Sequence, residues 1–136
     1  MTIKNDIILW NDGSTCLRLL SIPSEQQYKY IDGHPCITFG VSYENENFKG
    51  YDAFTLFDQH YINMLSEIKN TYASLNGVFR IYDIGADTDG YIEFFLENGI
   101  AYIKGQLGAS FSSHSLKLEF EADQTLIGSL IQAIEL

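Results

Sequence analysis

The dipeptide Asn98-Gly99 constrains the fold of this 136-residue chain more than any other short segment. It joins two runs, Tyr91–Glu97 and Ile100–Leu107, in which apolar and polar residues alternate. Asn-Gly is the strongest short signal for a two-residue hairpin turn, because both of its residues accept a positive φ. The segment therefore predicts two antiparallel strands connected by that turn.

Counting outward from the turn predicts which residues face each other across the two strands. Phe95 lies opposite Tyr102, and Glu93 lies opposite Lys104 on the same face. Aromatic pairs and opposite charges in such positions each contribute about 0.2–1 kcal/mol. We expect this face to be either open or covered by a helix. The other face is expected to join the core and carries Ile92, Phe94, Leu96, Ala101, Ile103 and Gly105.

An apolar stripe predicts an amphipathic helix near residues 56–75. Its members recur at steps of three and four residues and are Phe57, Tyr61, Met64, Leu65, Ile68, Tyr72 and Leu75. Thr55 and Asp58 have the spacing of a capping box at the start of a helix. Asn76-Gly77 is expected to end this helix, since glycine accepts the left-handed conformation common at helix ends.

The segment "LKLEFEADQTLIGSLIQAIEL", residues 116–136, changes its period in the middle. Alternation up to Glu121 predicts a strand, and the three- and four-residue steps after Leu126 predict a C-terminal helix near 124–135. Asp123 stands where an N-cap belongs, with Thr125 as a competing cap. We interpret the "ADQT" junction as a structural corner.

The order of the predicted elements indicates an α+β fold in a single domain, residues 1–136. We expect a curved, mostly antiparallel sheet, or two packed sheets, of about 7–8 strands. Polar residues from Pro23 to Pro35 predict a loop with room for a short strand at Tyr28–Ile31. The remaining strands are predicted at Ile7–Trp10, Thr15–Ile22, 37–43, Phe48–Phe54, Val78–Ile84 and Ser115–Glu121.

The charge balance, 18 acidic against 8 basic residues for a net charge of −10, argues against nucleic acid as a partner. An acidic surface keeps a protein soluble and can also steer a basic partner. The N-terminal segment has neither the apolar core of about 7–15 residues of a signal peptide nor a membrane span of about 20. We therefore expect a cytoplasmic protein that does not bind membranes. Cys16 and Cys36 are expected to be free thiols, with a disulfide between them as the alternative.

The densest acidic cluster comprises Asp83, Asp87, Asp89 and Glu93. Aligned on Gly90, it resembles an EF-hand loop, but a glycine and a leucine then occupy positions that need carboxylates. We interpret the cluster as an acidic turn between strands.

No catalytic or metal-binding motif stands out elsewhere in the sequence. None of His34, His60 and His114 has a partner at metal-ligand spacing. The segment "GASFS", 108–112, lacks the final glycine of a nucleophile elbow and joins two predicted antiparallel strands. We therefore predict a binding protein rather than an enzyme, with no cofactor, no metal and no catalytic residues.

Three segments resemble the small bacterial WapI-like immunity proteins. Residues 48–77 match a strand followed by an amphipathic helix that ends at a small residue and glycine. Residues 99–107, "GIAYIKGQL", are similar to a "G-x-(I/V)-x-(I/V)-x-G-x-L" pattern of that family. Residues 116–136 resemble its strand, Asp-Gln-Thr and helix ending. The resemblance covers roughly residues 36–136, and the first thirty-odd residues match loosely.

This resemblance implies a cytoplasmic protein that binds and neutralises a cognate bacterial toxin domain, with basic nucleases as one class of partner. An acidic face could cover a basic groove and speed association. Aromatic anchors surrounded by acids suit a binding hot spot. We expect a convex partner-binding face formed by Asp83, Asp87, Asp89, Glu93, Phe95, Glu97 and Tyr102.

Two other functions are open at this point. A small-ligand-binding β-rich domain without catalytic activity would need an apolar cavity of about 300 Å³ or more. A hydrolase would need a histidine within hydrogen-bond reach of a serine, cysteine or carboxylate in a cleft.

Overall fold

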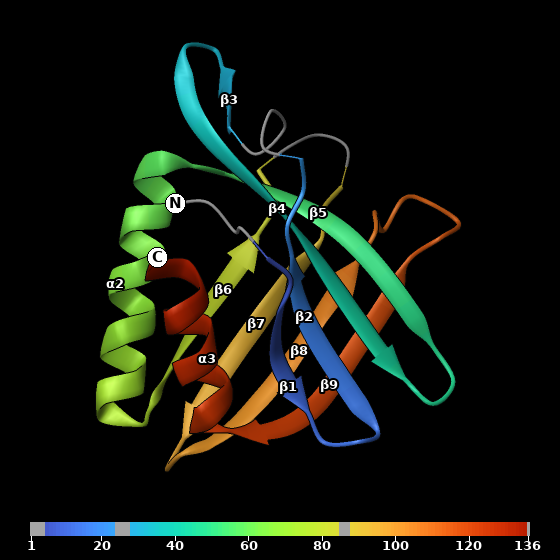
Figure 1. Cartoon of the computed structure of the whole chain (residues 1–136), viewed down its shortest axis with the longest axis vertical. Helices are drawn as coiled ribbons and strands as arrows, with labels where there is room; N and C mark the ends of the chain where they lie inside the picture. The colour runs from blue at the N-terminus through green and yellow to red at the C-terminus, as the bar shows by residue number, and fades with distance from the viewer. Residues whose placement is uncertain (1–4, 24–27, 85–87, 136) are drawn as a thin grey trace.

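The computed structural model of the protein describes residues 5–23, 28–84 and 88–135. Within these ranges, nine strands form a five-stranded and a four-stranded sheet, accompanied by two helices (Figure 1). The predicted α+β class is confirmed, and of the two predicted arrangements, one curved sheet or two sheets, the structure has the second. The elements are β1 (Ile7–Asn11), β2 (Thr15–Leu20), β3 (Tyr28–Ile31), β4 (His34–Asn45), β5 (Lys49–Phe57), α2 (Asp58–Ser74), β6 (Gly77–Tyr82), β7 (Tyr91–Glu97), β8 (Ile100–Leu107), β9 (Leu116–Asp123) and α3 (Gln124–Glu135).

Strand β4 organises the five-stranded sheet because it pairs along both of its edges. One edge pairs with β2 and then with β3, and the other pairs with β5. The short strand β3 forms because Asp32 and Gly33 adopt positive φ values of 52° and 81°, which make the tight turn that returns the chain onto β4. This strand brings the total to nine, against the predicted 7–8.

The four-stranded sheet has the order β6-β7-β8-β9, with all neighbours antiparallel. Asn98 and Gly99 have φ values of 52° and 82°, as the predicted hairpin requires. The predicted register is confirmed, since Phe95 pairs with Tyr102 and Glu93 pairs with Lys104. One short sequence signal therefore placed every side chain of these two strands on its correct face.

Helix α2 is confirmed, but the capping box predicted at its start is wrong. The helix begins at Asp58 directly after β5, and its N-cap residue Phe57 makes no side-chain cap bond. Thr55 belongs to β5, where it pairs with Thr38 and the two hydroxyl oxygens lie 2.9 Å apart. The ladder with β4 therefore holds Thr55 in a strand, which moves the helix start past it.

The end of α2 also differs in detail from the prediction. The C-cap is Leu75, which adopts the left-handed conformation with a φ of 58°, and Gly77 follows with a φ of 143°. The carbonyl of Leu75 accepts a hydrogen bond of 3.2 Å from the backbone N–H of Gly99. This contact ties the end of the helix to the β7–β8 turn and helps to hold Leu75 in a conformation that non-glycine residues seldom adopt.

The junction before α3 has the predicted N-cap. Asp123 Oδ1 accepts a hydrogen bond of 2.8 Å from the backbone N–H of Thr125. The backbone N–H of Gln124 donates to the carbonyl of Gly99 at 3.0 Å. The start of α3 is thus anchored to the same turn that receives the end of α2.

One continuous buried cluster joins both sheets and both helices. In Figure 1, α2 and α3 lie side by side, and β4 and β5 cross in front of the four-stranded sheet. Phe79 and Phe94 stack in the cluster with ring centroids 4.7 Å apart. Burying each such ring stabilises the fold by about 1.5–3 kcal/mol. From α3 the cluster receives Leu126, Ile127, Leu130, Ala133 and Ile134.

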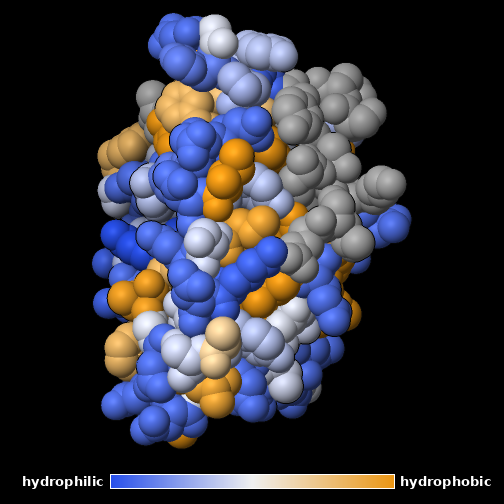
Figure 2. Space-filling view, turned by 90° about the vertical axis from the view of Figure 1, so that its left-hand side faces the viewer, coloured by the Kyte–Doolittle hydropathy of each residue, from blue (hydrophilic) through white to orange (hydrophobic). Residues whose placement is uncertain are grey.

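The side of the molecule that carries the helices is mostly hydrophilic, with patches of apolar surface between the polar residues (Figure 2). Across the described part of the chain, neither helix combines the length and the apolar character needed to cross a bilayer.

Candidate functional site

A row of large side chains crosses the solvent-facing side of the four-stranded sheet. The strand registers align Val78 of β6, Phe95 of β7 and Tyr102 of β8. Their exposed fractions are 56%, 42% and 42%. The helices pack against the opposite, buried side, so neither helix of the described chain covers this row. We call these residues, with the polar residues beside them on the same side of the sheet, the outer face.

A row of alternating charges lies next to the aromatic row. The registers align Arg80, Glu93, Lys104 and Glu119 across the four strands. Glu93 lies 3.5 Å from Arg80 Nε and 3.5 Å from Lys104 Nζ. The Arg80 guanidinium also lies 4.2 Å from the centroid of the Tyr91 ring. Because Arg80 and Lys104 both form ion pairs with Glu93, its negative charge is largely neutralised and attracts a partner only weakly.

Three other glutamates give the outer face its acidic character. Glu97, Glu119 and Glu121 are exposed, and within the described residues none of them forms an ion pair. Glu121 lies directly opposite Tyr102 across β8 and β9. Glu97 follows Phe95 by two residues, so it points to the same side of the sheet. The aromatic pair is therefore bordered by unpaired carboxylates.

We expected a convex face, but the outer face carries a shallow hollow. A depression of about 400 Å³ lies over β7, β8 and β9. Phe95 and Tyr102 line it together with Glu119 and Glu121.

Asp83 and Asp89 do not belong to the outer face. Asp83 follows β6, and its Oδ1 accepts a hydrogen bond of 2.6 Å from the backbone N–H of Thr55. Asp89 precedes β7, and Phe95 is six residues further along the chain, which corresponds to roughly 20 Å of extended strand. Asp83 and Asp89 therefore both lie at the end of the sheet where β6 leads into β7, whereas Glu93 lies within β7. Asp87 lies outside the described residues.

Hydrogen bonds to neighbouring segments hold Asp89 in place. Asp89 Oδ1 accepts from Gln106 Nε2 at 2.8 Å and from the backbone N–H of Ser110 at 2.7 Å. The Ser110 hydroxyl bonds to Asp89 Oδ2. The bonds from the Ser110 hydroxyl and backbone favour the charged carboxylate, and they hold the pKa of Asp89 below its ordinary value. Asp89 connects the β6–β7 and β8–β9 loops, which is a structural role.

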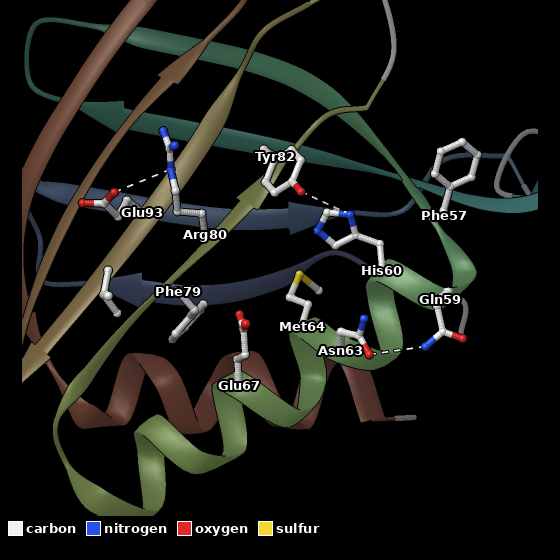
Figure 3. Close-up of a pocket in the computed structure, with 11 residues that line it drawn as sticks. Phe57, Gln59, His60, Asn63, Met64, Glu67, Phe79, Arg80, Tyr82 and Glu93 are labelled. Atoms are coloured by element: carbon white, nitrogen blue, oxygen red, sulfur yellow. Dashed lines mark hydrogen bonds and ion pairs between the residues drawn. The ribbon is translucent and has the colours of Figure 1, made fainter.

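A groove of about 750 Å³ runs between α2 and β6, at the edge of the outer face (Figure 3). Met64 and Glu67 reach it from α2, and Val78 and Arg80 reach it from β6. At one end His60 Nδ1 lies 3.4 Å from the Tyr82 hydroxyl. Val78 and Arg80 belong to both the groove and the outer face, so the two surfaces are continuous.

The histidines and cysteines are placed as follows. His34 packs edge-on against Phe57, with ring centroids 5.9 Å apart, and the backbone N–H of His114 donates to Ser112 Oγ at 3.1 Å. Over the described ranges no group of three or more His, Cys, Asp or Glu residues could hold a metal ion. Cys16 and Cys36 are free thiols, as predicted.

The sequence placed Glu93, Phe95, Glu97 and Tyr102 together correctly, because the hairpin turn fixes their register. It missed Val78, Glu119 and Glu121, which lie on the same face. The link from β8 to β9 spans residues 108–115 and has no two-residue turn that would fix the register. Comparison of the chain with protein-family models and with curated protein sequences gives no match.

Proposed function

We propose that the protein is an immunity protein that binds a cognate bacterial toxin domain stoichiometrically and neutralises it. The main observation in support of this proposal is the uncovered row of Val78, Phe95 and Tyr102 on the outer face, with unpaired glutamates beside it. Exposing apolar surface costs about 25 cal/mol per Å², which burial in a complex would recover. Aromatic anchors of this kind dominate binding energy at many interfaces.

The charge of the outer face defines the kind of partner that would fit. Glu93 is matched by Arg80 and Lys104, so the negative charge available to a partner comes from Glu97, Glu119 and Glu121. A basic surface would be attracted to these carboxylates, and the net charge of −10 would add a longer-range attraction. We therefore propose a partner with a basic surface, of which a nuclease groove is one example.

The small-ligand alternative has no comparable observation in its favour. Side chains of the buried cluster fill the space between the two sheets. The α2–β6 groove and the hollow on the outer face are surface features rather than enclosed cavities. A solvent-exposed aromatic pair fits a protein partner better than a small molecule, whose sites bury most of the ligand.

The direct test is co-expression with bacterial toxin domains, beginning with any that is encoded beside the gene for this chain. We expect the protein to restore the growth of cells that produce the toxin domain. We also expect the two purified proteins to form a 1:1 complex, measured by light scattering. An unrelated protein of similar negative charge is the control for non-specific attraction. If the protein neither protects the cells nor forms a complex with the toxin domain, the proposed function is contradicted.

A further inference from the structure

Strand β6 has a free edge, and two hydrogen bonds fix which backbone groups point toward it. The N–H of Asp83 donates to the carbonyl of Gly90 at 3.2 Å, which continues the ladder toward β7. Alternate residues of a strand bond to the same side, so Phe79 and Ile81 also bond to β7. Even-numbered residues therefore face away from β7. The N–H of Ile84 accordingly donates at 3.0 Å to the carbonyl of Thr55, on the opposite side.

The backbone groups of Val78, Arg80 and Tyr82 thus point to the free edge. Within the described residues, no hydrogen bond to the backbone N–H or carbonyl of these three residues crosses that edge. All three residues are exposed. A row of unpaired donors and acceptors of this kind is a template for an additional strand.

Helix α2 limits what can pair with this edge. It runs alongside β6, and the groove between them has a volume of about 750 Å³ (Figure 3). Val78–Tyr82 spans about 16 Å. An extended segment could lie there with alternate side chains directed to the outer face and into the groove. A second copy of the chain would carry its own α2 into the same space. Pairing two β6 strands about Arg80 would also set the two guanidinium groups opposite each other, which is unfavourable.

The side chains along the free edge of β6 determine which kind of partner segment would fit there. Val78 ends the aromatic row of the outer face, so an apolar side chain beside it would extend that row. Glu67 lines the groove, is exposed and forms no ion pair within the described residues. A basic side chain directed into the groove would pair with it.

We propose that the toxin partner binds by adding an extended strand to β6, with an apolar side chain beside Val78 and a basic side chain beside Glu67. The inference rests on the proposed function and specifies how the partner docks. The partner strand would continue the four-stranded sheet, and the rest of the partner would cover Phe95 and Tyr102. Backbone hydrogen bonds would supply affinity, and the two side-chain contacts would supply specificity.

The first test is residue-resolved amide hydrogen exchange. The probe is an inactivated form of the toxin domain from which this protein protects cells in the co-expression test. In the free protein, the amides of Val78, Arg80 and Tyr82 are expected to exchange faster than those of Phe79 and Ile81, which bond to β7. In the complex, the amides of the first three are expected to slow by at least about tenfold.

The second test compares Val78→Pro with Val78→Thr. Both variants replace the valine side chain, but only proline removes the N–H that points to the free edge, and proline is tolerated on an edge strand. We expect Val78→Pro to bind the toxin domain about two- to tenfold more weakly than Val78→Thr, because it loses one backbone hydrogen bond to the partner. Unfolding midpoints of both variants control for misfolding, and the exchange test on the unmodified protein does not depend on either variant.

The outcomes separate the two proposals. A complex in which the edge amides exchange as in the free protein and both Val78 variants bind equally would overturn strand addition and leave the proposed function standing. Failure to form any complex would overturn both. A dimer of the free protein that protects the three amides would assign this edge to a second copy instead.

Discussion

Phe95 and Tyr102 face each other across β7 and β8, with ring centroids 6.0 Å apart and planes tilted by 39°. The β6–β7 pairing places Val78 opposite Phe95, and the β8–β9 pairing places Glu121 opposite Tyr102. The aromatic pair is therefore the middle of a row that begins at the free edge of the sheet and ends at an unpaired carboxylate. Its position makes it the first target for mutation.

The double substitution Phe95→Ala and Tyr102→Ala should weaken toxin binding by about 30-fold or more, the loss of a typical hot spot of 2 kcal/mol. The free energy of unfolding should fall by only about 0.2–1 kcal/mol, because the rings pair on the surface. Isothermal titration and urea denaturation measure the two effects. Phe48→Ala, on an exposed aromatic residue of the β4–β5 turn, is the matched control and should bind normally. Equal losses in both variants would contradict the assignment of the outer face.

Charge reversal at Glu97→Lys and Glu121→Lys should act on the rate of association. Removing the unpaired carboxylates weakens electrostatic steering, and we expect the association rate constant to fall by about tenfold at low salt. The difference should shrink as salt is added, because ions screen exposed charges. Stopped-flow measurements at two salt concentrations test this. Glu46→Lys, in the β4–β5 turn, makes a single charge reversal away from the outer face and should have a smaller effect.

Asp123→Ala should destabilise the protein by about 1 kcal/mol, because the first turn of α3 loses its N-cap. Toxin binding by the folded variant should be nearly unchanged. Asp123→Asn keeps an acceptor for the Thr125 N–H and should retain most of the stability. Urea denaturation and titration of the two variants provide the comparison. A large loss of binding at unchanged stability would show that the junction contacts the partner.

Asp89 should make stability depend on acidic pH. Its pKa is lower in the folded protein than in the unfolded chain, owing mainly to the hydrogen bonds from Ser110. Its contribution to stability is therefore present above the unfolded pKa, about 3.9, and is lost as the pH falls through the lower folded value. Asp89→Asn should be less stable than the original protein at pH 7.

The stability difference should then shrink as the pH is lowered below about 4. Urea denaturation at pH 7 and at pH 3 measures it. Glu119→Gln is the control, since this exposed residue forms no ion pair within the described part of the chain. A difference between Asp89→Asn and the original protein that does not vary with pH would contradict the proposed role of the charge.

Local signals predicted much of the fold. Asn98-Gly99 fixed the β7–β8 register because a two-residue turn leaves one way to pair the flanking strands. The apolar stripe placed α2, and Asp123 marked the start of α3. The capping box at Thr55 was wrong because pairing with Thr38, 17 residues earlier in the chain, extends β5 past it. A long-range ladder overrode a local motif.

The candidate site depended more on long-range structure. The sequence grouped Asp83 and Asp89 with Glu93 because they are neighbours in the chain. The structure engages both aspartates in hydrogen bonds with other segments and leaves Glu119 and Glu121 beside the aromatic pair. The β8–β9 pairing places these two glutamates on the outer face. The register of that pairing could not be predicted, because no two-residue turn connects the strands.

The sequence by itself determined the type and order of the main strands and helices and the two faces of the central hairpin. These properties follow from side-chain periodicity and turn chemistry within a few residues. Only the tertiary structure decided whether a helix covers the outer face of the four-stranded sheet. Among the described residues, both helices pack on the buried side, which leaves Phe95 and Tyr102 uncovered and one edge of β6 unpaired. The choice depends on which surfaces bury the most apolar area together, and no local segment encodes it.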